Sequence, residues 1–113
     1  MTSSQQPAPI LACNLQAIPQ DFRPLHQASV QHVFASIQEI QELLTGYALR
    51  LPNDPDVLQS AVSFISYERL CCPFFRFELA IEPDLGPIWL RLTGNTDVKP
   101  FLQGILPEQD SGV

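Results

Sequence analysis

Two runs of alternating apolar and polar residues constrain the fold of this chain more than any other feature. On one side, both runs carry large apolar residues: Phe75, Phe77, Leu79 and Ile81 in the first, and Ile88, Leu90 and Leu92 in the second. Alternation with a period of two is typical of β-strands with one buried face. Residues 82–87 between the runs, E-P-D-L-G-P, are typical of a turn. We therefore predict two adjacent strands whose apolar face needs a covering layer.

A helix that ends just before the first of these strands is predicted to supply part of that layer. Asp54 can cap its first turn, and Pro55 suits the first helical position. The apolar spacing continues to Cys71, and Pro73 then excludes helical geometry at Cys72. The pattern predicts a helix over residues 55–71.

The remaining elements follow from spacing and turn residues. Helical spacing predicts an earlier helix over residues 25–44 with Gly46 as its C-cap. Short strands are predicted at 10–15 and 47–51, and a last short helix at 97–106. The expected fold is α+β, in the order β-α-β-α-β-β-α. It is a two-layer sandwich with a mostly antiparallel four-stranded sheet and helices on one face. We expect one domain spanning 1–113, with flexible tails at 1–9 and 108–113.

Composition narrows the function classes. Twelve acidic and six basic residues give a net charge of −6, which argues against nucleic-acid and anionic-membrane partners. An apolar run long enough to cross a bilayer is absent from the sequence. Three cysteines are an odd number, which does not suit a secreted disulfide framework. We therefore expect reduced thiols and a cytoplasmic protein.

The main chemical feature is the adjacent pair Cys71 and Cys72. Helical spacing places Glu68 on the same face as Cys71. Two thiolates and a carboxylate could bind a thiophilic ion such as Zn(II), Cu(I) or Hg(II). Cys13, on the apolar side of its predicted strand, could add a third sulfur from beneath the second helix. The metal-site candidates are therefore Cys71, Cys72, Glu68 and Cys13.

Two other interpretations of these cysteines stay open. Free cysteine behaves as a small buried hydrophobe, so all three could be core residues. The cysteines could also carry out thiol redox chemistry. A helix C-terminus and Glu68 both raise a thiol pKa, however, which disfavours the reactive thiolate. A bound cation would offset both effects, so electrostatics favours a metal over a bare nucleophile.

A second candidate surface is the polar side of the predicted sheet. It carries four candidate residues for a ligand or interface: Trp89, Arg91, Arg76 and Arg50. Such a face could bind a small anion or a second subunit, forming a homodimer, or could simply be solvated and held by cross-strand ion pairs. His26 and His32 are six residues apart, which is not a ligand spacing on one helix face. No catalytic residue is assigned, and an enzyme is the least favoured class.

The chain also resembles a family of short uncharacterised bacterial proteins. The motifs are E-R-L-C-C-P-F-F from Glu68 and G-P-I-W-L-R-L-T-G from Gly86, which match the family signature E-R-x-C-C-x-F and G-P-x-W-L-x-L-T-G. Cys13-Asn14-Leu15 and Gly46-Tyr47 are similar to earlier family motifs. The resemblance implies no activity. Any metal handling it implies rests on the same thiols.

Overall fold

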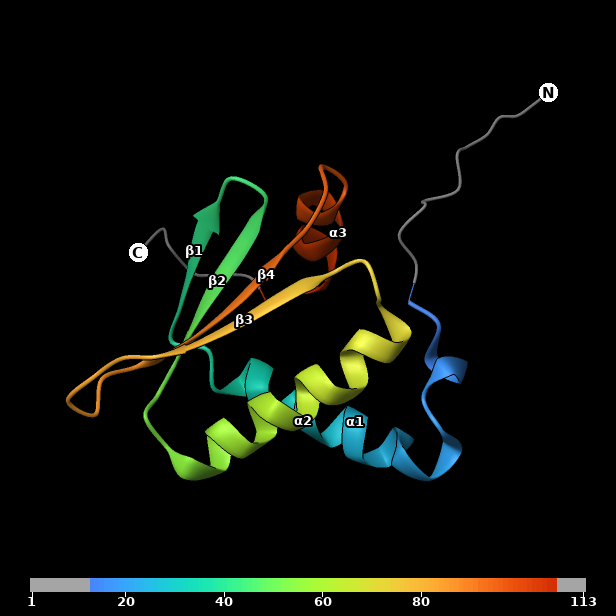
Figure 1. Ribbon diagram of the computed structural model, residues 1–113, viewed down its shortest axis with the longest axis horizontal. Helices are drawn as coiled ribbons and strands as arrows, with labels where there is room; N and C mark the ends of the chain where they lie inside the picture. Colours follow the sequence, from blue (N-terminus) through green and yellow to red (C-terminus); the bar gives the residue numbers. More distant parts are fainter. Residues whose placement is uncertain (1–12, 108–113) are drawn as a thin grey trace.

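The computed structural model describes residues 13–107 (Figure 1). Two short 3-10 turns, η1 (Leu15–Ala17) and η2 (Gln20–Phe22), come first. The main elements then follow in chain order: α1 (Arg23–Ala35), β1 (Glu39–Leu43), β2 (Gly46–Leu51), α2 (Pro55–Cys71), β3 (Arg76–Ile81), β4 (Ile88–Thr93) and α3 (Val98–Ile105). The tails predicted at 1–9 and 108–113 lie outside the described residues.

The four strands form one antiparallel sheet in the order β1-β2-β4-β3. Leu90 of β4 lies opposite Leu49 of β2 on one side and Leu79 of β3 on the other. Cross-strand partners share a face, so these leucines form one apolar row. Leu49 and Leu90 are fully buried. The predicted four-stranded antiparallel sheet is confirmed.

The described helices all pack on the apolar face of this sheet. The ring of Phe64 in α2 contacts Phe34 of α1 and Phe77 of β3, with centroids 6.1 and 6.3 Å apart. At the other end of the same face, the amide of Gln103 in α3 donates a hydrogen bond to the Tyr47 hydroxyl at 2.9 Å. The predicted α+β class, with helices on one side of the sheet, is therefore confirmed. The described part of the chain contains no helix of the length and apolarity that a membrane span requires.

Helix α2 begins and ends at the predicted residues. The Asp54 carboxylate accepts a hydrogen bond from the backbone N–H of Asp56 at 2.8 Å, which satisfies one free donor of the first turn. Cys72 has φ −128° and ψ 70°, outside the helical region, as expected for a residue before proline. Cys71 and Cys72 therefore lie where the chain turns from helix to strand.

The helix predicted over residues 25–44 is wrong in its second half. Helix α1 ends at Ala35, and residues 39–43 form strand β1 beside β2. Apolar Ile37 and Ile40 suit helical spacing, but pairing with β2 satisfies the backbone of the segment instead. Gly46 is not a C-cap: it opens β2, where a Cβ would collide with the carbonyl oxygen of Leu92.

The strand predicted at residues 10–15 is also wrong for residues 13–15, the part that the structure describes. Residues 10–12 lie outside the described chain, and Leu15 already belongs to η1. Asn14 favours this turn because its side-chain oxygen accepts a hydrogen bond from the N–H of Gln16 at 3.1 Å. The described order is thus α-β-β-α-β-β-α, with β1 in place of the predicted first strand.

Candidate functional site

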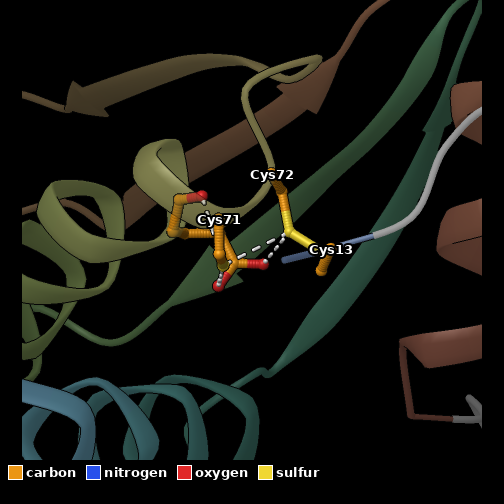
Figure 2. Close-up of side chains that lie close together, drawn as sticks. Cys13, Cys71 and Cys72 are labelled. Carbon is orange, nitrogen blue, oxygen red and sulfur yellow. Dashed lines mark hydrogen bonds between the residues drawn. A yellow bond between two sulfur atoms is a disulfide. The ribbon is translucent and has the colours of Figure 1, made fainter. Parts of the chain in front are cut away.

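The three cysteines and Glu68 meet at the C-terminal end of α2 (Figure 2). Cys71 is the last residue of the helix, Cys72 follows it, and Glu68 lies one turn earlier. Cys13 arrives from the N-terminal segment, which is docked by a hydrogen bond from Asn14 N–H to the Cys71 carbonyl oxygen at 2.8 Å. One side-chain ligand atom from each of the four residues lies within 4.8 Å of every other.

Two of the three sulfurs are joined. Cys13 and Cys72 form a disulfide across 59 residues of sequence, and Cys71 is a free, buried thiol. The Sγ atoms of Cys71 and Cys72 lie 3.5 Å apart. The expectation of three reduced thiols is therefore corrected. An odd number of cysteines leaves one thiol unpaired, but it does not prevent the other two from forming a disulfide. The expected position of Cys13 on a strand beneath α2 is corrected too: it lies beyond the helix end and is exposed.

Glu68 is a buried carboxylate held between a histidine and the sulfurs. Its Oε1 accepts a hydrogen bond from Nε2 of His26 at 2.7 Å. Its Oε2 lies 3.2 Å from Cys72 Sγ. His26 is 8% exposed and Glu68 7%. A carboxylate in so little water needs a hydrogen-bond donor such as His26, and this contact leaves Oε2 beside the Cys72 sulfur.

Burial raises the pKa of the Cys71 thiol from its ordinary value of 9.0 to about 11, and the negative charge of Glu68 adds to the effect. Both causes disfavour the thiolate. Cys71 therefore keeps its proton at neutral pH and is a poor nucleophile there. A positive ion beside Glu68 would reverse this preference.

His26 is the site residue that sequence reasoning missed. The sequence offers His32, six residues away, as its nearest possible partner in a ligand pair, whereas its actual partner Glu68 is 42 residues away. Local spacing gives no signal for such a contact. His32 instead lies 2.6 Å, Nδ1 to Oγ, from Ser60 on the exposed side of the α1–α2 pair. His26 also lines a pocket of about 340 Å³ with four other residues: Leu15, Arg23, Gln27 and Val30.

The residues of the second predicted surface lie on one face of the sheet, as expected. Arg50 of β2 lies opposite Trp89 of β4, and Arg91 lies opposite Glu78 of β3. Arg50 forms an exposed ion pair with Glu39 at 3.7 Å across the β1–β2 strands. Arg76, on the same face, lies 3.8 Å from Glu78. The four candidates share the sheet face opposite the described helices. The ion pairs of Arg50 and Arg76 are also what a solvated face would show.

Comparison with known proteins gives no match to a family model, to a curated protein or to a solved structure. The family suggested by the E-R-x-C-C-x-F and G-P-x-W-L-x-L-T-G motifs therefore stays a prediction. The function is therefore inferred from the chemistry of the cysteine–Glu68 cluster and of the sheet face that carries Trp89.

Proposed function

We propose that the reduced protein is a non-enzymatic binding protein for a soft metal or metalloid ion, held by Cys71 and Cys72 with help from Glu68 and Cys13. One observation carries the proposal: three sulfurs and a carboxylate oxygen, from segments far apart in sequence, lie within 4.8 Å of one another. Three thiolates and one carboxylate suit thiophilic ions such as Zn(II), Cu(I) or Hg(II).

The electrostatics of the cluster support a cation in particular. Cys71 is 1% exposed and lies next to the Glu68 carboxylate, so a second uncompensated negative charge there is costly. A divalent ion balances two thiolates and displaces their protons as it binds. The features that make Cys71 a weak nucleophile are therefore compatible with its being a metal ligand.

His26 has a supporting part in this proposal. Its hydrogen bond holds Oε1 of Glu68, and Oε2 lies 3.2 Å from Cys72 Sγ. Partners of this kind orient a ligating carboxylate, and removing one lowers metal affinity by about 10–100-fold. His26→Gln should therefore weaken binding by that factor without abolishing it.

The disulfide sets the condition under which binding occurs. Cys13 and Cys72 are bonded to each other, so neither sulfur is a thiolate until that bond is reduced. The binding form therefore belongs to a reducing compartment, and we propose the cytoplasm.

The experiment is a metal titration followed by native mass spectrometry. Protein is reduced, freed of reductant under argon and titrated separately with Zn(II) and Hg(II). We expect one ion per chain. The Cys71→Ser/Cys72→Ser double variant should lose that stoichiometric binding because hydroxyls are poor ligands for soft ions.

The matched control is Glu78→Gln, which removes an exposed carboxylate, compared with Glu68→Gln at the cluster. Only the Glu68 substitution should weaken binding. Tight binding that survives in the double cysteine variant would contradict the proposal. If none of the titrated ions binds the reduced wild type, Cys71 and Cys72 are better explained as core residues and Cys13 as the partner of Cys72 in a structural disulfide.

A second candidate function uses the sheet face that carries Trp89. The described helices pack on the opposite face, so none of them covers the four residues Arg50, Arg76, Trp89 and Arg91. Aromatic and arginine side chains are enriched in interfaces. This face would join two copies of the chain in a homodimer or bind a small anionic ligand.

Trp89 is the only tryptophan, so its fluorescence tests the dimer directly. A dimer predicts blue-shifted emission that moves to longer wavelength on dilution. Sedimentation equilibrium should show the same dissociation, and Arg91→Glu should shift it to higher protein concentration. Emission typical of exposed indole at every concentration would leave this face as solvated surface.

A further inference from the structure

The disulfide beside the Glu68 carboxylate has two unlike ends. Cys13 is exposed, whereas Cys72 is 0% exposed. Cys72 is flanked by Cys71 Sγ at 3.5 Å and by Glu68 Oε2 at 3.2 Å. In Figure 2, Cys13 and Cys71 lie on different sides of the Cys72 sulfur. A reagent from solution therefore meets different surroundings at the two sulfurs.

We infer that Cys13 is a site of S-thiolation, at which a small soluble thiol opens the Cys13–Cys72 disulfide. The small thiol loses its proton and its sulfur attacks Cys13 Sγ. A new S–S bond forms there, the Cys13–Cys72 bond breaks, and its electron pair leaves with Cys72 Sγ. Cys72 takes up one proton from solvent. The products are a mixed disulfide at Cys13 and a thiol at Cys72, and a second molecule of the small thiol then releases Cys13.

Access directs the attack to Cys13. Exchange needs the thiolate to approach along the S–S axis, opposite the sulfur that leaves. For Cys13 that approach comes from the side away from buried Cys72. An attack on Cys72 would have to enter a buried region. The exposed position of Cys13 therefore favours it as the attacked sulfur.

Cys71 offers an internal alternative, and the structure argues against it. An attack by Cys71 Sγ on Cys72 would release Cys13 and leave a disulfide between adjacent residues. Closing that ring would require the peptide between them to leave the geometry that ends α2. The small thiol is thus expected to act directly, without relay through Cys71.

This inference goes beyond metal binding and can fail or hold independently of it. Opening the disulfide frees two of the proposed ligands, but the exchange step itself involves no metal. Its test is therefore done with a chelator present, and a negative metal titration would leave it standing.

The test treats disulfide-intact protein with glutathione, then traps free thiols with N-ethylmaleimide and digests with trypsin. Cleavage after Arg50, Arg69 and Arg76 separates residues 1–50, which contain Cys13, from residues 70–76, which contain Cys71 and Cys72. Mass spectrometry should find the glutathione adduct on 1–50 and maleimide on 70–76. A majority of the adduct on 70–76 would overturn the inference.

Two variants separate direct attack from the alternatives. Cys71→Ser keeps the disulfide and removes the internal thiol, so the adduct should appear on 1–50 at an unchanged rate. Cys13→Ser, in contrast, leaves only the buried thiols. With oxidised glutathione it should be thiolated about tenfold more slowly than the reduced wild type, because access limits exchange. Equal rates in this comparison, or a large loss of rate in Cys71→Ser, would refute the assignment to Cys13.

Discussion

Cys71 is the one cysteine outside the disulfide, so its ionisation can be followed without interference from the other two sulfurs. Alkylation by iodoacetamide reports it because only the thiolate reacts. Burial and Glu68 raise the pKa of Cys71 from its ordinary 9.0 to about 11. Below pH 9 the thiolate fraction of Cys71 is therefore smaller in folded protein than in unfolded protein. The deficit is about 100-fold, a factor of ten for each pKa unit. In unfolded protein the deficit should vanish.

The assay measures the alkylation rate at several pH values by intact mass, with and without guanidinium. Burial also slows the reagent, but that lowers the rate at every pH and leaves the midpoint unchanged. In folded protein the rate should keep rising tenfold per pH unit to about pH 11. In unfolded protein it should level off near pH 9. Circular dichroism at each pH confirms that the folded sample remains folded.

Glu68→Gln separates the two main causes of the shift. Burial is the larger cause and remains in the variant, whereas the charge of Glu68 is removed. The midpoint should therefore fall part of the way from 11 towards 9.0, and Glu78→Gln should leave it unchanged. A wild-type midpoint at or below 9 would refute the reasoning and favour thiol redox chemistry.

The same pKa shift predicts how stability depends on pH. The folded pKa lies above the unfolded one, so the contribution of Cys71 is complete below pH 9.0 and is lost as the pH rises through about 11. As the pH rises, Cys71→Ser should therefore lose less unfolding free energy than the wild type, because it has no thiol at this position to ionise. Urea titrations between pH 8 and 11 measure this difference.

Four further substitutions concern the scaffold, and the effect of each is measured as the free energy of unfolding in urea. Phe64→Ala removes a fully packed ring between α1, α2 and the sheet and should cost about 3–5 kcal/mol. Gly46→Ala forces a methyl group against the Leu92 carbonyl and should cost about 1–3 kcal/mol, whereas Gly104→Ala, in open space on α3, should be stabilising by about 0.5–1 kcal/mol. Asp54→Ala removes the N-cap of α2 and should cost about 1 kcal/mol. A Gly46 variant as stable as wild type would contradict the close approach of β2 and β4.

The elements with complete local signals could be predicted from the sequence. Helix α2 has a capping aspartate and a proline at its start, and a second proline stops it after Cys71. Strands β3 and β4 have strict alternation around a turn. In each case the residues that define the element lie within it or next to it. Neighbouring side chains and backbone angles therefore suffice to specify it.

Strand β1 shows where this reasoning stops. Its five residues, E-I-Q-E-L, carry too few apolar positions to separate a strand from a continued helix. The choice depends on β2, which supplies hydrogen-bond partners along the whole of β1. Such pairing is a property of the assembled sheet.

The candidate site divides in the same way. Helical spacing alone brings Glu68, Cys71 and Cys72 together at the end of α2, and those three residues are readable from the sequence. Only the tertiary structure brings Cys13 to Cys72, 59 residues away, and His26 to Glu68, 42 residues away. Contacts at such separations depend on how α1 and the N-terminal segment pack against α2, because no local rule of spacing or propensity extends across intervening elements.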